Sequence, residues 1–337
     1  MIQTTATREL FTVDWQGGTL CGTCHLPAKG LVGSNRIGIL LLAGFPMPRA
    51  AHGDAAVCWA TSFAEFGYPS FRVDLPGVGD SDGDVPAELL KYISAGGYER
   101  VAAELAEQIV ARHKLAGVVI LGQCSGAITA MFAAAISAKC RGLILLDPPF
   151  HLPPAVRPTV KLALFRWSTR SRIGGLLSNG YDHLKKLRMQ VRMQAGMQAG
   201  KNAPPENANF PLLKRWKHLA SAGMPVLLLT APEPKATDTK PRAGKFDYLQ
   251  YILDLAGSRS RVEARVVAGA NHTFSNPLGK AAVREHVADW MATFFPFERS
   301  AQAAETLTQR AASNIETEFA HRHSILAPVD APLGVKG

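Results

Sequence analysis

Short apolar runs bounded by Gly or Pro recur along the chain and alternate with segments of helical periodicity. The first two runs, residues 10–15 and 19–26, predict an antiparallel pair of strands joined through Gly17 and Gly18. Residues 37–42 are continuously apolar, which is typical of a strand buried on both faces. Five later runs predict further strands: 70–75, 117–121, 142–146, 225–229 and 262–267.

Helical spacing of apolar residues fills the segments between these strands. Residues 54–66 carry apolar side chains on one face and end at Gly67, a common helix stop. The same spacing predicts helices over 98–115 and 283–294. Because strands that alternate with helices favour a mostly parallel sheet covered on both faces, the sequence predicts an α/β fold.

One long segment, residues 148–223, interrupts this alternation. It is helical in character but is broken by Pro and Gly pairs, and its position in the chain is where a lid would sit. The chain therefore divides into four parts. Residues 1–147 are the first part of the core, and residues 148–223 are a basic helical lid. Residues 224–298 are the second part of the core, and residues 299–337 are a peripheral helix with a loose tail.

The charge of the chain is concentrated in the predicted lid. The 337 residues carry a net charge of +10, and residues 148–223 alone contribute 13 Lys and Arg against two acidic residues. This surface is either simply solvated, or it receives anionic substrates or anionic lipid headgroups at a membrane surface. Its aromatic residues show no stacking pattern, so we expect no nucleic-acid partner.

The remaining composition favours a soluble, cytoplasmic globular protein without bound metal. The first 15 residues lack the features of a secretory signal, and no apolar run reaches the roughly 18 residues of a membrane span. Five cysteines without disulfide spacing fit a reducing compartment, so a cytoplasmic location is expected. Cys21 and Cys24 form a C-x-x-C pair, but no second pair completes a zinc site. We expect no metal and no cofactor.

The strongest chemical signal lies in residues 122–126, which follow an apolar run and precede a helix of small residues. Glycines stand two positions before and two positions after Cys124, which is the pattern of a nucleophile elbow. If Ser125 were the nucleophile, Gln123 and Ala127 would occupy the positions that need the smallest residues. The frame therefore predicts Cys124 as the nucleophile, where serine is usual.

A nucleophile of this kind needs a base and an acid that orients the base. His272 follows the last predicted strand, in the right order after the elbow, and is the expected base. Glu233 is the first carboxylate after the penultimate strand and is the favoured acid. Asp238, on the same loop, and Asp147, at the end of an earlier strand, remain alternatives.

Two backbone amides are expected to form an oxyanion hole. One is the N–H of Ser125, directly after the nucleophile, and the other is the N–H of Phe45 in the loop after the third strand. A further glycine-rich turn, residues 74–83, lacks the glycine spacing of a phosphate-binding loop, and a structural role is predicted for it.

Four motifs carry a resemblance to a known family: residues 43–46, 74–81, 122–126 and 271–275. In their order and spacing they resemble the α/β-hydrolase superfamily, and the resemblance covers about residues 10–297. The elbow cysteine and residues 272–275 are similar to hydrolases encoded with exosortase A systems of exopolysaccharide-producing bacteria. Those proteins tend to have Asp where Ser125 and Glu233 stand here. The resemblance implies an α/β-hydrolase fold with a lid inserted in the core.

The leading hypothesis is an acyl hydrolase, an esterase or thioesterase, that forms an acyl-cysteine intermediate on a Cys-His-acid triad. Since an acyl thioester can be intercepted by a second nucleophile, an acyltransferase acting on a sugar or another alcohol is an alternative. A non-catalytic binding protein built on the same fold is a third. The expected partner is a small acyl compound, and it is anionic if the basic lid receives substrate. The sequence leaves the acyl chain, the leaving group and the oligomeric state open.

Overall fold

The structure of the protein, a computed structural model, describes residues 6–28, 36–152, 204–205, 207–232, 246–258 and 260–296. Most of the predicted lid and the whole of the predicted tail lie outside these ranges. The elbow, the loop of His272 and the core strands lie within them.

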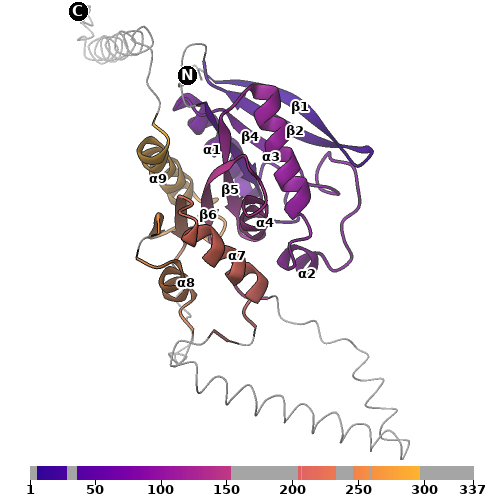
Figure 1. Ribbon diagram of the computed structural model, residues 1–337. Helices are drawn as coiled ribbons and strands as arrows, with labels where there is room; N and C mark the ends of the chain where they lie inside the picture. Colours follow the sequence, from indigo (N-terminus) through magenta and orange to yellow (C-terminus); the bar gives the residue numbers. More distant parts are fainter. Residues whose placement is uncertain are drawn as a thin grey trace, which may run out of the picture.

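A single mixed sheet forms the centre of the described structure (Figure 1). Its strands lie in the order β1-β2-β4-β3-β5-β6-β7-β8. The antiparallel start is as expected, because β1 pairs with β2 and β2 with β4 in that sense, and all later pairs are parallel. The strands are β1 Thr7–Trp15, β2 Gly18–Leu26, β3 Ile37–Leu42, β4 Ser70–Val73, β5 Gly117–Gln123, β6 Cys140–Leu146, β7 Val226–Thr230 and β8 Val262–Val266.

Helices cover both faces of this sheet. Helices α1 and α9 pack on one face, and α3, α4, α7 and α8 contribute to the core on the other (Figure 1). None of the helices in the described ranges is both long and apolar enough to cross a membrane. The helices are η1 His52–Asp54, α1 Ala55–Glu65, α2 Leu89–Ser94, α3 Glu99–His113, α4 Ser125–Ala134, α7 Phe210–Ser221, α8 Tyr248–Ala256 and α9 Pro277–Phe294.

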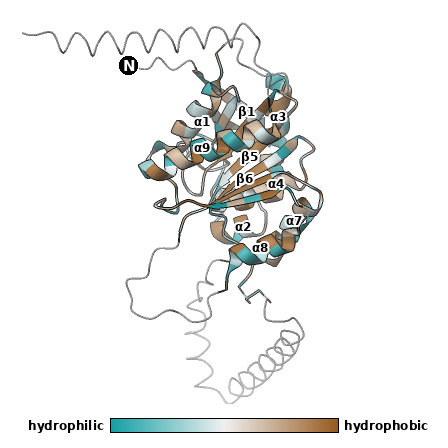
Figure 2. Cartoon of the chain, turned by 90° about the vertical axis from the view of Figure 1, so that its left-hand side faces the viewer, coloured by the Kyte–Doolittle hydropathy of each residue, from teal (hydrophilic) through white to brown (hydrophobic). Residues whose placement is uncertain are grey.

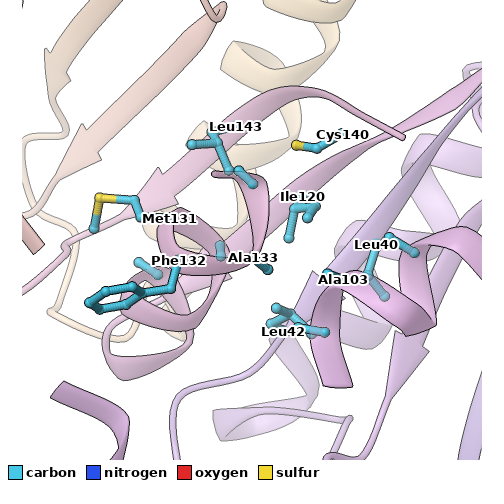
Figure 3. Close-up of a cluster of buried hydrophobic side chains, with 14 of the residues drawn as sticks. Leu40, Leu42, Ala103, Ile120, Met131, Phe132, Ala133, Cys140 and Leu143 are labelled. Atoms are coloured by element: carbon cyan, nitrogen blue, oxygen red, sulfur yellow. The ribbon is translucent and has the colours of Figure 1, made fainter. Parts of the chain in front are cut away.

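The core is built from the continuously apolar strands in the middle of the sheet. All residues of β3 and β5 are buried, and β5 and β6 lie between α9 and α4 (Figure 2). On the α4 side, Ile120 of β5 and Leu143 of β6 lie in one cluster with Met131 and Phe132 of α4 (Figure 3). Since both faces of these strands are covered, their sequences need no polar alternation, which explains the unbroken apolar runs.

The end of the predicted lid segment is part of the core. Asn209 accepts a hydrogen bond from Leu212 N–H at 3.2 Å and so caps α7. Trp216 of α7 is fully buried and donates from Nε1 to the carbonyl of Ile252 in α8 at 2.7 Å. Residues 210–221 therefore pack on the body of the fold, and the lid remains a prediction for the preceding residues.

The glycine-rich turn after β4 holds the loop that follows β3. The Asp74 carboxylate accepts hydrogen bonds from the backbone N–H of Arg49 and, at 3.2 Å, of Asp80, and it pairs with the Arg49 guanidinium. The Ser81 hydroxyl donates to the Asp74 carbonyl at 2.7 Å. A Cβ on Gly79 would collide with the Asp74 carboxylate. These contacts show a structural role for the turn.

Candidate active site

Cys124 stands at the sharp turn between β5 and α4. Its backbone has φ 50° and ψ −119°, a region that residues with a Cβ seldom adopt. The Cys124 N–H donates to the carbonyl of Leu146, the last residue of β6, at 2.8 Å. Cys124 is half-buried, and the turn places it at the carboxyl end of the parallel strands, where open α/β sheets bind their ligands.

The two glycines of the elbow are needed because backbone packs against them. A Cβ on Gly122 would lie 2.5 Å from the Cα of Ala127, and one on Gly126 would lie 2.6 Å from the carbonyl oxygen of Ala43. Real Cβ atoms essentially never approach that closely. The frame that makes Cys124 the central residue is therefore the one that the packing requires.

His272 lies in the loop between β8 and α9, and two side chains fix this loop. Buried Gln123, directly before Cys124, donates from Nε2 to the carbonyl of Thr273. Asn271 accepts from the N–H of Ser275 at 2.9 Å and donates to its hydroxyl at 2.9 Å. The Gln123 contact ties the histidine loop directly to the elbow, and sequence reasoning missed it.

His272 interacts with two groups of opposite function. Its Nδ1 pairs with Oδ2 of Asp147, and Cys124 lies close enough to the imidazole to affect its pKa. The hydrogen bond to Asp147, followed by the effect of Cys124, raises the pKa of His272 to about 10. The imidazole is thus positively charged at neutral pH.

The carboxylate that the structure brings to His272 is Asp147, the residue after β6. Its backbone φ of 49° turns the chain sharply at the end of the strand. Its side chain is 26% exposed, against 55% for His272, so the acid is the better-shielded member of the pair. Glu233, the favoured acid, and Asp238 lie outside the described residues.

The two predicted oxyanion donors differ in availability. Phe45 N–H already donates to the hydroxyl of Ser125 at 2.8 Å. Ser125 N–H, at the start of α4, has no acceptor among the described residues. The Phe45 amide is therefore already engaged in this conformation, because α4 places the Ser125 side chain in front of it.

Aromatic rings hold Phe45 in place beside the elbow. The ring of Phe45 stacks on Tyr98, with centroids 4.7 Å apart and an interplanar angle of 11°. Tyr98 in turn meets Tyr92 edge-on at 5.0 Å and donates its hydroxyl to the carbonyl of Pro76 at 3.3 Å. The loop after β3 is thus fixed both by this stack and by Asp74.

Within the described ranges, no group of three or more His, Cys, Asp or Glu side chains is placed to hold a metal ion. Cys21 and Cys24 both lie on β2 as free thiols. Cys24 is buried and donates to the carbonyl of Glu9 at 3.4 Å, which gives it a structural environment.

One protein-family model matches most of the chain. The family model described as "Alpha/beta hydrolase family" matches residues 39–297, which include the elbow, Asp147 and the histidine loop. No curated protein sequence matches the chain significantly.

Solved structures with the same fold are distant in sequence. An esterase from Pyrococcus furiosus is 14% identical, with a TM-score of 0.54, over 86% of this chain and 92% of its own. The thioesterase domain from the curacin biosynthetic pathway is 15% identical, with a TM-score of 0.50, over 85% and 99%. A proline iminopeptidase from Mycobacterium smegmatis is 16% identical, with a TM-score of 0.50, over 85% and 98%. At such identities the likeness is one of fold.

Proposed function

This chain belongs to the alpha/beta hydrolase family and is a hydrolase, and we propose that it cleaves carboxylic esters or thioesters through a covalent acyl-cysteine. The observation that carries the proposal is the position of His272, whose Nδ1 pairs with Asp147 and whose imidazole is near enough to Cys124 for the thiol to affect its pKa. A nucleophile, a proton carrier and a group that orients the carrier then stand in sequence.

In the acylation step, the Cys124 sulfur attacks the carbonyl carbon of the substrate as a thiolate, and its proton resides on His272. The carbonyl oxygen becomes an oxyanion in the tetrahedral intermediate. When the intermediate collapses, the bond to the leaving group breaks and His272 gives its proton to the departing alkoxide or thiolate. The product of this half-reaction is an acyl thioester on Cys124.

In the deacylation step, water attacks the carbonyl carbon of the acyl-cysteine while His272 accepts a proton from it. The Cys124 thiolate then leaves, and the free acid is released. Deacylation requires neutral His272, and Asp147 keeps the pKa of that histidine high. We therefore expect deacylation to be the slower half-reaction near neutral pH.

We propose Asp147 as the acid of the triad in the place first given to Glu233. Its contact with Nδ1 of His272 leaves the other ring nitrogen to face the thiol. The carboxylate also stabilises the imidazolium that carries the proton between the two half-reactions. Glu233 and Asp238 remain the alternative acids.

Acyl transfer is the second candidate, and the raised pKa of His272 favours it. Because hydrolysis of the acyl-cysteine requires neutral His272, the intermediate lives longer while the histidine is protonated. An alcohol can then react with it in place of water. The likeness of the elbow and of residues 272–275 to hydrolases encoded with exosortase A systems supports a saccharide as acyl donor or acceptor in the cytoplasm. Anionic substrates or a membrane surface at the basic lid segment belong to the same proposal.

The test is a turnover assay with p-nitrophenyl esters and acyl-coenzyme A thioesters of increasing chain length, alone and with added mono- and oligosaccharides. We expect turnover in the wild type and a loss of at least about 1,000-fold in Cys124→Ala and His272→Ala. Free acid as sole product supports hydrolysis, and acylated sugar supports transfer. Equal rates in wild type and both variants would overturn the proposal and leave a binding protein.

A further inference from the structure

Ser125 has a hydroxyl that accepts a hydrogen bond but does not donate one. The side chain is buried, with 5% of the residue exposed, and its oxygen receives the N–H of Phe45 at 2.8 Å. A serine hydroxyl has one proton to donate as well as lone pairs to accept with. Among the described residues the structure gives that proton no acceptor. A buried donor without an acceptor costs stability unless a ligand satisfies it.

This hydroxyl lies beside the nucleophile. The point where a Cβ of Gly44 would stand is 3.3 Å from the Cβ of Cys124 and 3.8 Å from the hydroxyl oxygen of Ser125. Because Gly44 has no side chain, the loop after β3 approaches the elbow closely enough for Phe45 N–H to reach Ser125. The hydroxyl thus contacts the amide that was expected to bind an oxyanion, and its residue directly follows the proposed nucleophile in the chain.

Building on the proposed cysteine chemistry, we propose that the Ser125 hydroxyl is itself an oxyanion donor. It accepts from Phe45 N–H and donates its proton to the negatively charged oxygen of the tetrahedral intermediate, next to the backbone N–H of Ser125. The Phe45 amide then acts through the hydroxyl, since a hydroxyl that accepts a hydrogen bond donates more strongly. No covalent bond of Ser125 forms or breaks.

The same contact could have the opposite, inhibitory role, which we call a plug. In that role the Ser125 hydroxyl blocks Phe45 N–H, and it has to rotate away before the amide can bind the oxyanion. The two roles predict changes of opposite sign for Ser125→Ala. Removing a donor lowers kcat, whereas removing a plug frees the Phe45 amide and leaves kcat equal or higher. Alanine keeps the backbone N–H of residue 125 in both cases.

The experiment compares wild type, Ser125→Ala and Ser125→Thr in p-nitrophenyl ester turnover and in binding of an alkyl trifluoromethyl ketone. Addition of the Cys124 sulfur to this ketone gives an anionic tetrahedral adduct. We expect Ser125→Ala to lose about 10²-fold in kcat with little change in KM, and to bind the ketone more weakly by a similar factor. Ser125→Thr, which keeps the hydroxyl, restores most of both. Thermal unfolding of each variant checks that it is folded.

Alkylation of Cys124 by iodoacetamide is the control, because iodide is displaced without an oxyanion. We expect its rate to be unchanged in Ser125→Ala. A fall in alkylation equal to the fall in kcat would assign Ser125 to the structure of the elbow and overturn the proposal. Turnover of Ser125→Ala at or above the wild-type rate would overturn it in favour of the plug.

Failure of the underlying function has a different signature. A wild type that binds the ketone at Cys124 but turns over no ester would contradict the hydrolase, and the ratio of ketone affinities would still decide the role of Ser125. A wild type in which the ketone never adds to Cys124 forms no oxyanion there. That result would overturn the proposals for both residues.

Discussion

At the residue scale, the charge of His272 decides which steps are fast. Its hydrogen bond to Asp147, followed by the effect of Cys124, raises its pKa to about 10, so at neutral pH the histidine carries the proton that the leaving group needs. Once Cys124 is acylated, the thiol no longer contributes to this effect, and Asp147 remains. The carboxylate therefore governs the balance between the two half-reactions.

Asp147→Asn is expected to move the alkaline limb of kcat/KM to lower pH. Acylation needs the protonated imidazole, which is lost as the pH rises through its pKa. Without the carboxylate, that pKa falls from about 10 toward the ordinary value of about 6.5. The measurement is kcat/KM for a thioester between pH 6 and pH 11, with Asp289→Asn, an exposed acid on α9, as the control.

An unchanged alkaline limb in Asp147→Asn would contradict this assignment. If Glu233→Gln shifted the limb under the same conditions, the acid would be Glu233. Both variants are therefore measured together.

The sequence predicts Cys124 and His272 from local patterns, because a turn frame and a position after the last strand are both visible along the chain. It ranks Asp147 below Glu233, because which strand ends lie beside the histidine loop depends on the order of strands in space. That order places β6 directly beside β5. The hydrogen bond from Phe45 to Ser125 is likewise invisible in the sequence, since 80 residues separate them.

At the element scale, the site is made where β5 turns into α4 and where the loop after β8 reaches that turn. Glycines at residues 122 and 126 let α4 start against the strand, and Gln123 ties the two loops together. The long buried strands were predictable from their apolar runs. Helix α2 was not, because it is short and buries only two residues. Helix α8 was missed although its apolar residues recur at helical spacing.

Gly126→Ala is expected to damage both stability and activity. The added methyl would lie 2.6 Å from the carbonyl oxygen of Ala43, so α4 or the loop after β3 must shift, at a cost of about 1–3 kcal/mol. Since that shift displaces Phe45 and Ser125, we expect a fall in kcat of at least about 10-fold. Urea unfolding and ester turnover measure the two effects.

Gly223→Ala is the matched control. Gly223 has φ 73°, and nothing lies within 4 Å of the position of a Cβ. The substitution therefore measures the cost of backbone strain alone, without a steric clash. We expect it to lose about 1 kcal/mol and no activity. Equal losses of activity in both variants would contradict the close packing inferred for the elbow.

Gln123→Met is expected to lower activity at little cost in stability. It removes the donor to the Thr273 carbonyl, but it also removes a buried Oε1 that has no partner in the described part of the chain. The two changes offset each other in the free energy of unfolding. We expect kcat to fall about 10-fold as His272 loses its fixed position, and iodoacetamide alkylation of Cys124 to slow in parallel. An unchanged kcat would show that Asp147 alone positions the histidine.

At the scale of the whole molecule, two histidines make the free energy of unfolding depend on pH. One lowers it at acid pH, and the other lowers it at alkaline pH. His25 on β2 is fully buried and accepts a hydrogen bond from Arg72 at 2.9 Å. Burial, followed by the charges of Arg72 and Arg8, lowers the pKa of His25 to about 3. His272 is shifted in the other direction, so its contribution to stability is present below about pH 6.5 and is lost as the pH rises through about 10.

His25→Gln is expected to flatten the acid side of the stability curve. In the unfolded chain His25 binds a proton below about pH 6.5, whereas the folded protein resists that proton down to about pH 3. The free energy of unfolding therefore falls across this window by an amount on the order of 5 kcal/mol. Glutamine still accepts from Arg72 but does not titrate. Urea unfolding at pH 8, 6, 5 and 4 measures the difference, and parallel curves for wild type and variant would contradict it.

The central claim, that Cys124 accepts the acyl group, is tested most directly by the mass of the intact protein. Wild type is mixed with an acyl-coenzyme A thioester, quenched in acid within seconds, weighed and digested with a protease. We predict a mass increase of one acyl group per chain, located on the peptide that contains Cys124, and none in Cys124→Ala. A stable adduct on another residue, or the same adduct in Cys124→Ala, would contradict the account.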